Sequence, residues 1–278
     1  MEYKDRILGS NTQYLRYPLE FFLAEMERMG LRRLDFTPKV PHFFCSGSAC
    51  TPADDLLVVL DRHHLQVGAV TPPAYRYALT APEGAQRQHT ERYYRTCINL
   101  TAQLGCKAMV LDGAGACWDL PVDVLLDNAQ RMLHVLCEEA EKQDVRILLA
   151  PVMGSATPLM AEAPVLNTAQ DLQQMLERVD HDNLGVCLDT NVMSTCGGTI
   201  DDWFARLGDR TELVRLCDGN SHGWRAWGEG VLPMDKYLRA LNSAGYRGDI
   251  SLYLGGERYA QKPSQATAKT LAALCGEE

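Results

Sequence analysis

Four apolar segments decide the fold of this chain. They are ILLAPV (147–152), VCLDTN (186–191), LVRLCDG (213–219) and ISLYLGG (250–256). Each has the length and composition of a buried β-strand followed by a loop. The residues at the ends of these strands are Ala150, Asp189, Arg215 and Tyr253. Three of the four are polar, so the strand ends are where we look first for function.

Strand and helix patterns alternate along the rest of the chain. The expected strands are 6–11, 32–38, 66–73, 107–115, 145–152, 184–190, 212–219 and 249–255. The expected helices are 18–30, 52–64, 86–105, 121–143, 169–179, 200–208, 233–245 and 262–275. Pro18 and Gly30 fit the two ends of the first helix, and Thr168 is a suitable N-cap for the fifth. Units of roughly thirty residues or more are typical of parallel βα repeats.

Eight such units fit either a closed (β/α)₈ barrel or an open doubly wound sheet. Because the units are regular and fill the chain, the pattern favours the barrel. No linker or change of composition interrupts it, so residues 1–278 are expected to form one domain. The longest irregular stretches, 37–51, 72–86, 153–167 and 218–232, each follow a strand. They are therefore expected at the C-terminal face, where barrels carry their active sites.

Composition narrows the class of protein. The net charge of −9 and the pI near 5.3 disfavour nucleic acid and anionic membranes as partners. The N-terminal sequence does not resemble a signal peptide, and no apolar run is long enough to span a membrane. The ten cysteines show neither C-x-x-C pairs nor zinc-finger spacing. We therefore expect reduced thiols and a cytoplasmic protein.

Polar residues at the strand ends are the candidates for chemistry. In a barrel, alternate side chains point inward and the last inward one meets the pocket. Asp189, Arg215 and Tyr253 stand in that position, and Asp112 and Asp218 sit one or two residues beyond a strand end, in the loops. Asp189 and Tyr253 are the candidates for catalysis. All five are candidates for ligand binding.

Two interpretations of Asp189 and Arg215 remain open at this stage. The two side chains, on adjacent strands, could form a partly buried salt bridge that only stabilises the barrel. Alternatively, both could face a ligand, since perturbed charged pairs gather at functional sites. Arginine keeps its proton and does not bind metals at neutral pH, so its position disfavours a cation there.

The segment DGNSHGWRAWGEG (218–230) concentrates polar and aromatic side chains. Tryptophan faces pack well against the C–H groups of sugars and against cations. We therefore add Trp224, Arg225 and Trp227 to the candidate ligand-binding residues. The alternative is a loop that two tryptophans simply pack over the barrel mouth.

Several segments resemble the xylose isomerase-like TIM barrel family of sugar isomerases and epimerases, in particular its ketose 3-epimerase and fructoselysine 3-epimerase branch. The similarity covers nearly the whole chain. The most specific segments are VTPP (70–73), CINLTAQLGC (97–106), ILLAPV, CLDTN and GEGVLPMDKYLRALNSAGYRGDISLYL (228–254). The resemblance implies a (β/α)₈ barrel, and it makes a homo-oligomer one expectation, because dimers and tetramers are frequent in the family.

The resemblance also implies a divalent metal held by Glu, Asp, His and Glu at four strand ends, with the two glutamates transferring a proton. The corresponding residues here are Ala150, Asp189, Arg215 and Tyr253, so one of the four metal ligands is retained. Arg225 matches a substrate-contacting arginine of the family. General acid–base catalysis contributes roughly 10²–10⁴-fold per group, and metal polarisation adds to it. Loss of both glutamates and of three ligands is therefore expected to abolish the inherited reaction and the need for a metal cofactor.

Three hypotheses follow. The first is a barrel that binds a carbohydrate-like ligand, such as a sugar–amine adduct or a sugar phosphate, without the ancestral metal or reaction. The second is an active isomerase or epimerase that works without metal, or with a metal relocated to Asp112, Asp189, Asp218 and Glu257. The third is a non-catalytic subunit that pairs with an active relative.

Overall fold

The computed structural model describes residues 4–73, 77–112, 116–117, 120–153, 162–163, 165–255 and 258–276. Its central feature is a closed barrel of parallel strands in the order β1-β12-β9-β8-β6-β4-β3-β2. The strands are β1 (Ile7–Ser10), β2 (Arg33–Phe36), β3 (Gln66–Val70), β4 (Ala108–Asp112), β6 (Arg146–Ala150), β8 (Leu184–Asp189), β9 (Thr211–Arg215) and β12 (Asp249–Ser251). The closed barrel is confirmed and the open sheet is excluded.

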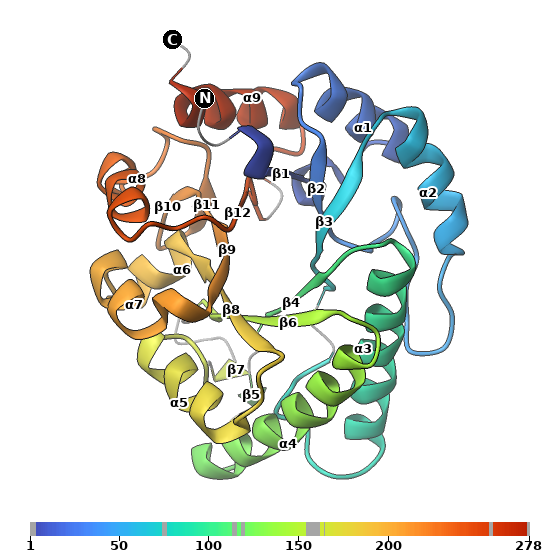
Figure 1. Ribbon diagram of the computed structural model, residues 1–278, viewed down its shortest axis with the longest axis vertical. Helices are drawn as coiled ribbons and strands as arrows, with labels where there is room; N and C mark the ends of the chain where they lie inside the picture. Colours follow the sequence, from blue (N-terminus) through green and yellow to red (C-terminus); the bar gives the residue numbers. More distant parts are fainter. Residues whose placement is uncertain are drawn as a thin grey trace.

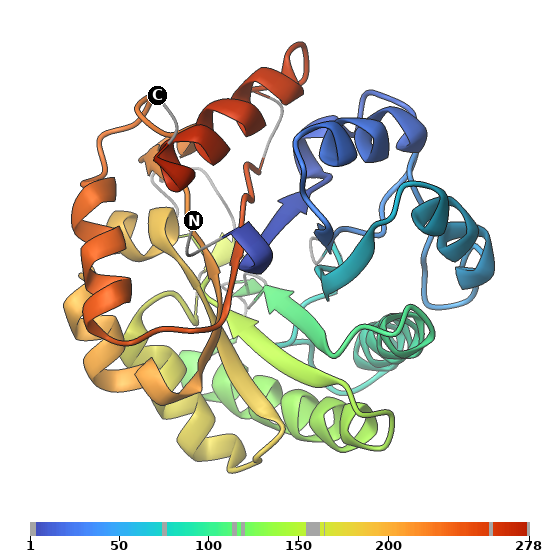
Figure 2. The ribbon, with the colours of Figure 1, turned by 45° about the horizontal axis from the view of Figure 1, so that its top comes forward.

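Helices surround the strands on the outside, as both ribbon views show (Figures 1 and 2). They are α1 (Leu19–Arg28), α2 (Ala53–Arg62), α3 (Ala85–Gln103), α4 (Val122–Glu141), α5 (Ala169–Val179), α7 (Ile200–Leu207), α8 (Met234–Ser243) and α9 (Pro263–Cys275). Short 3₁₀ turns lie at η1 (Lys4–Arg6), η2 (Thr12–Tyr14) and η3 (Gly208–Arg210). In the described residues no helix combines the length and apolarity needed to cross a membrane.

Local sequence explains where α5 begins. Thr168 accepts a hydrogen bond from the backbone N–H of Asp171, whose side chain accepts one from the N–H of Thr168. This reciprocal capping box satisfies two N–H groups that the first turn leaves without helical partners. Its position confirms the predicted start of α5.

The core of the described residues has two main parts because alternate strand residues point in opposite directions. Cys217, Ala226, Leu254 and Ala266 form a small third cluster. The larger part fills the space between strands and helices. The smaller part lies inside the barrel and consists of Leu8, Ala69, Val110, Leu148, Ala150, Cys187 and Leu213. Cys97, Cys137 and Cys187 are buried thiols that behave as small apolar side chains, as the sequence predicts. Polar side chains replace the apolar ones at the C-terminal end of the interior.

Four features differ from the sequence-based expectation. The chain enters a short helix, α6 (Thr190–Thr195), directly after β8, where we expected a loop. Strands β10 (Asp218–Asn220) and β11 (Gly223–Arg225) form a hairpin within the stretch expected to be irregular. A further pair, β5 (Ala116–Cys117) and β7 (Glu162–Ala163), is also antiparallel. β12 ends at Ser251, so Tyr253 follows the strand rather than ending it.

Candidate ligand-binding site

A layer of polar side chains closes the C-terminal end of the barrel interior and has Arg215 at its centre. Its other members are Asp35, Thr71, Asp112 and Ser251. Arg215 ends β9, its side chain is 3% exposed, and its Nη1 donates to Oδ1 of Asp112 at 2.8 Å. Nη2 donates to the hydroxyl of Thr71 at 3.2 Å. The guanidinium carbon lies 4.2 Å from the ring centre of Tyr253, a cation–π distance. Burial disfavours the charge, but Asp112 and other neighbours raise the pKa of Arg215 well above its usual value.

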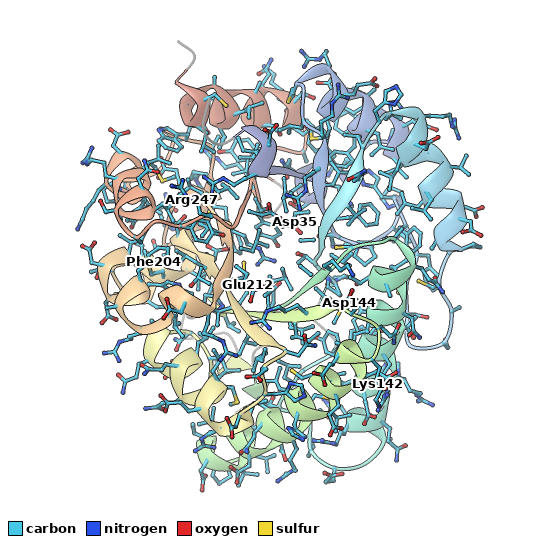
Figure 3. The ribbon with its side chains drawn as sticks, in the orientation of Figure 1. Asp35, Lys142, Asp144, Phe204, Glu212 and Arg247 are labelled. Carbon is cyan, nitrogen blue, oxygen red and sulfur yellow. The ribbon has the colours of Figure 1, made fainter. Side chains whose placement is uncertain are left out.

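Asp35 lies inside the ring of strands, on β2 (Figure 3). Its two carboxylate oxygens accept hydrogen bonds from the hydroxyls of Thr71, at 2.6 Å, and Ser251, at 2.7 Å. Burial raises the pKa of Asp35, and the positive charge of Arg215 acts in the opposite direction. The layer therefore connects β2, β3, β4, β9 and β12 through one buried network.

Tyr253 covers Arg215 and contacts the indole ring of Trp224 edge-on, with ring centres 5.6 Å apart. Burial is the main cause that raises the pKa of Tyr253 above its ordinary value, despite the nearby guanidinium. The phenol is thus protonated at neutral pH. A protonated phenol can donate a hydrogen bond but cannot act as a base, and catalysis by Tyr253 stays a prediction.

Asp189 is fully enclosed at the junction of β8 and α6. Its Oδ1 accepts hydrogen bonds from the backbone N–H groups of Asn191 and Val192, each at 3.0 Å, and so caps α6. Its Oδ2 accepts one from the indole N–H of Trp224 at 2.8 Å. Burial raises the pKa of Asp189. The salt bridge considered between Asp189 and Arg215 is wrong, because the ion pair of Arg215 in the described residues is with Asp112.

A cavity of about 340 Å³ opens at the C-terminal mouth beside this layer. Its polar lining comes from the loops after β1 and β2 and from the ends of β3 and β4, and consists of Thr12, Gln13, Arg16, Thr37, Lys39, Thr71 and Asp112. Pro72, Pro73 and Tyr253 contribute apolar surface. The volume lies in the range of small-ligand sites.

The loop after β9 is organised around Asp218, which is 2% exposed. Its carboxylate accepts hydrogen bonds from the backbone N–H groups of Gly219, Gly228, Gly230 and Leu232, at 2.7–3.0 Å. Because these four N–H groups use both of its oxygens, Asp218 holds the loop in place.

The other candidates in this loop contact the protein itself. Arg225 donates to the backbone oxygens of Trp224, at 2.8 Å, and Gly223, at 3.4 Å. The ring of Trp227 packs against the outer core. The packing interpretation of the loop therefore describes its contacts, and ligand binding by Asp218, Arg225 and Trp227 stays a prediction.

The residues at the four strand-end positions do not fit a divalent cation. Ala150 has no donor atom and is buried in the inner core. The oxygens of Asp189 are occupied by N–H groups, Arg215 is a cation, and Tyr253 is a protonated phenol. Among the described residues, no cluster of three or more His, Cys, Asp or Glu side chains could hold a metal ion.

The relocated metal site meets a similar difficulty. Asp189 and Asp218 are each engaged by backbone N–H groups, and Asp112 is paired with Arg215. Glu257, the fourth proposed ligand, lies outside the described residues.

Of the residues proposed from sequence, Asp112 and Tyr253 line the cavity, and Arg215 lies directly beneath them. Asp189 and Trp224 form a second group behind Tyr253. Sequence reasoning missed Thr37, Lys39 and Arg16, which carry no motif. Thr71 stands at the start of the Thr-Pro-Pro turn after β3, a signal that could have identified it.

The family assignment rests on comparison with known proteins. Residues 23–275 match the family described as xylose isomerase-like TIM barrel. The chain belongs to this family. It is 21% identical over 237 residues to fructoselysine 3-epimerase of Shigella flexneri, covering 84% of each protein.

Solved structures support the same fold. One is the apo form of 3-keto-D-glucoside 4-epimerase from E. coli, with a TM-score of 0.78, 17% identity and coverage of 98% and 99% of the two chains. Another is the IOLI protein with a bound zinc atom, with a TM-score of 0.80, 17% identity and 98% coverage of each chain. At such identities the structures establish a shared barrel and nothing finer.

Proposed function

We propose that this member of the sugar isomerase/epimerase family binds a carbohydrate-like ligand at the barrel mouth and does not catalyse the metal-dependent reaction. One observation carries the proposal. A guanidinium, fixed by Asp112 and Thr71 and covered by Tyr253, occupies the strand-end position that the family resemblance assigns to a metal ligand. A divalent cation there would meet like charge within the buried layer.

The cavity offers the groups that a polyhydroxylated ligand needs. Asp112 has a 31% exposed side chain and can accept hydrogen bonds from hydroxyl groups while Arg215 holds its position. Pro72, Pro73 and the ring of Tyr253 give C–H groups an apolar surface. Sites of this kind combine apolar walls with a few fixed polar groups that set orientation.

The side chains that line the cavity also favour a second candidate function, that of an isomerase or epimerase that works without metal. Asp112 is a carboxylate and Tyr253 a protonated phenol, and both line the same cavity. In such a reaction Asp112 would remove a proton from the carbon beside the substrate carbonyl and then return it to a carbon of the enediolate, while Tyr253 would donate a hydrogen bond to the developing enediolate oxygen. Arg215 would stabilise the negative charge from below.

Three measurements on the purified protein test the proposal. Elemental analysis and calorimetric titration with Mn²⁺, Co²⁺ and Mg²⁺ should show neither stoichiometric metal nor saturable binding. Calorimetry with D-fructose and D-tagatose should show binding that Asp112→Asn and Tyr253→Ala weaken. Arg33→Met, at the opposite end of the barrel, is the matched control and should leave binding unchanged.

Two results would contradict it. Stoichiometric metal that supports epimerisation would reject the loss of the ancestral reaction. Solvent deuterium incorporated into D-fructose after metal removal, and abolished by Asp112→Asn, would instead establish the second candidate.

A further inference from the structure

We propose that Cys45 and Cys50 are a redox-sensitive pair, which forms a reversible disulfide and thereby stiffens the loop after β2. This loop, residues 37–51, supplies Thr37, Lys39 and Val40 to the wall of the cavity. Both cysteines are free thiols in the structure. Their chemistry does not depend on which ligand the cavity binds.

The backbone of the loop holds the two cysteines directly opposite each other. Cys45 and Cys50 are partners in an antiparallel β-bridge near the end of the loop. Two backbone hydrogen bonds of 2.8 Å flank the pair, from the N–H of Thr51 to the oxygen of Phe44 and from the N–H of Ser46 to the oxygen of Ala49. Because these bonds join the residues on either side of the pair, the cysteines occupy a non-hydrogen-bonded site.

A non-hydrogen-bonded site suits a disulfide. Facing Cα atoms at such a site lie about 4.5 Å apart, and the two side chains project from the same face of the hairpin. Disulfides span Cα distances of about 4.4–6.8 Å, so the bond needs only a small adjustment of the hairpin. The turn between the cysteines is fixed by Ser46, whose hydroxyl accepts hydrogen bonds from the N–H groups of Ser48, at 3.3 Å, and Ala49, at 3.1 Å.

A third thiol lies beside the pair. The Sγ of Cys45 is 3.9 Å from the Sγ of Cys97 on α3, and the thiol of Cys45 also interacts with that of Cys50. Cys97 is buried, whereas Cys45 and Cys50 are both partly exposed. A dissolved oxidant can therefore reach the hairpin pair and is shielded from Cys97.

Both thiols of the pair are held in the protonated form. Contact with Cys97 and burial raise the pKa of Cys45, and burial is the main cause that raises the pKa of Cys50 to about 12. Because the thiolate is the reactive form, oxidation is slow at neutral pH and becomes faster as the pH rises. The extent of oxidation at equilibrium depends instead on how well the hairpin accommodates the bond.

Glutathione disulfide can serve as the oxidant. The thiolate of Cys50, the less buried of the pair, attacks one sulfur of glutathione disulfide, breaks its S–S bond and releases one glutathione thiolate. The thiolate of Cys45 then attacks the sulfur of Cys50 in this mixed disulfide and releases the second glutathione. Two electrons pass from the cysteine pair to glutathione disulfide, and the two thiol protons end on the two released glutathiones.

The hairpin contacts a second wall of the cavity through α3. A Cβ atom on Gly47, in the turn of the hairpin, would lie 3.3 Å from the backbone nitrogen of Tyr93, so the turn packs closely on this helix. The hydroxyl of Tyr93 donates to the backbone oxygen of Pro73 at 3.0 Å, and Pro73 lines the cavity. A disulfide in the hairpin thus acts beside two parts of the cavity wall.

The test equilibrates the full chain with mixtures of reduced and oxidised glutathione at about pH 8, where exchange is faster than at neutral pH. Alkylation, trypsin digestion and mass spectrometry then locate the oxidised thiols. Cleavage after Lys and Arg leaves Cys45 and Cys50 in one peptide, 40–62, and Cys97 in another, 96–107. We expect peptide 40–62 to lose both alkylation sites and two hydrogen atoms as oxidised glutathione increases, and to regain them with dithiothreitol.

Two variants and a second measurement locate the effect. Cys50→Ser should keep every remaining thiol open to alkylation under the same conditions. Cys275→Ser is the matched control, because it removes another partly exposed thiol, from the end of α9, and should still form the disulfide. Hydrogen exchange at the N–H groups of Ser46 and Thr51 should slow roughly tenfold in the oxidised protein, as expected when a cross-link restricts local opening. Circular dichroism verifies that both variants fold.

Three outcomes would overturn the proposal. In the first, peptide 40–62 keeps both alkylation sites, or only carries attached glutathione, in every mixture. In the second, the bridge joins peptide 40–62 to peptide 96–107, so that Cys97 and not Cys50 is the partner of Cys45. In the third, the disulfide forms but hydrogen exchange at Ser46 and Thr51 stays the same, and the loop is not stiffened. None of these outcomes bears on carbohydrate binding.

Discussion

The two ends of the barrel interior differ in how their charged side chains are paired. At the N-terminal end two arginines each face one carboxylate on another strand, Arg33 with Asp249 and Arg146 with Glu212. Figure 3 labels Glu212. The side chains of the first pair are 35% and 24% exposed. At the C-terminal end one buried guanidinium faces Asp112 directly and feels the charges of two further carboxylates, Asp35 and Asp189.

This difference separates stabilisation from function. Exposed, one-to-one pairs contribute little to stability and tolerate replacement. A buried layer with more acids than bases is costly to build, because each charge loses its hydration. Such arrangements concentrate at functional sites. The C-terminal layer is therefore the part of the interior that selection for folding alone would not produce.

Removal of Arg215 should have the largest effect. Arg215→Met leaves Asp112 and the neighbouring buried carboxylates without their cation, at a cost of about 3–5 kcal/mol. Urea unfolding measures the loss. Arg215→Lys keeps the charge but loses the two-pronged contact with Asp112 and Thr71, so it should fall between Arg215→Met and the wild type. A loss no larger than that of Arg33→Met would remove the distinction between the two ends.

Trp224→Phe should have the next largest effect. It deletes the N–H donor to Asp189 while keeping an aromatic ring beside Tyr253. Leaving a buried carboxylate oxygen without its donor costs about 1–3 kcal/mol. Trp227→Phe is the control in the same unfolding experiment, because it also replaces a partly buried indole by a smaller ring. Equal losses would show that the hydrogen bond to Asp189 contributes nothing.

The pH dependence of Asp35 sharpens the comparison further. The pKa of Asp35 is raised in the folded state. In the pH range above about 3.9, the pKa of an aspartate in the unfolded chain, the carboxyl group of Asp35 therefore keeps its proton in the folded protein and has lost it in the unfolded one. Wild-type stability should therefore fall, relative to Asp35→Asn, as pH rises from the unfolded pKa through the folded one. Each pKa unit of separation corresponds to about 1.4 kcal/mol. Parallel stability curves for the two proteins would contradict the raised pKa.

The smallest effect is expected at the N-terminal end. Arg33→Met removes one member of a partly exposed pair, keeps much of the apolar stem, and leaves Asp249 accessible to water. We expect a loss of about 1 kcal/mol or less, which should shrink further in 0.5 M salt. A larger loss of stability that salt does not reduce would show that the charged pairs at this end contribute as much to stability as the buried network at the other end.

The sequence predicts the barrel well because its signals are local. Apolar runs and turn residues mark each strand and helix independently, and three of the four expected strand-end residues, Ala150, Asp189 and Arg215, do end their strands. The start of α5 is a case in point, since Thr168 and Asp171 are three residues apart and recognise each other without help from the rest of the fold.

The partners within the site could not be predicted in the same way. Asp112 and Arg215 lie on β4 and β9, which are not neighbours in the barrel, so they meet only across its interior. Because Asp189 lies beside Arg215 in the register of β8 and β9, it was the expected ion-pair partner of Arg215. Its carboxylate oxygens instead accept hydrogen bonds from the first turn of α6 and from Trp224. The Asp189-Thr190-Asn191 sequence contains an N-cap residue that could have indicated this helix.

Asp218 gives the barrel mouth a property that matters for redesign. The carboxylate of Asp218 holds the following loop through hydrogen bonds from backbone N–H groups, and a side chain at Gly230 would collide with this carboxylate. Gly228 has a positive φ of 78°. If Asp218, these glycines and Trp224 are kept, the exposed side chains at the tip of the hairpin, Ser221 and His222, can be exchanged without changing how the chain is tethered. The tip is thus a place where new recognition chemistry can be installed while the barrel beneath it stays the same.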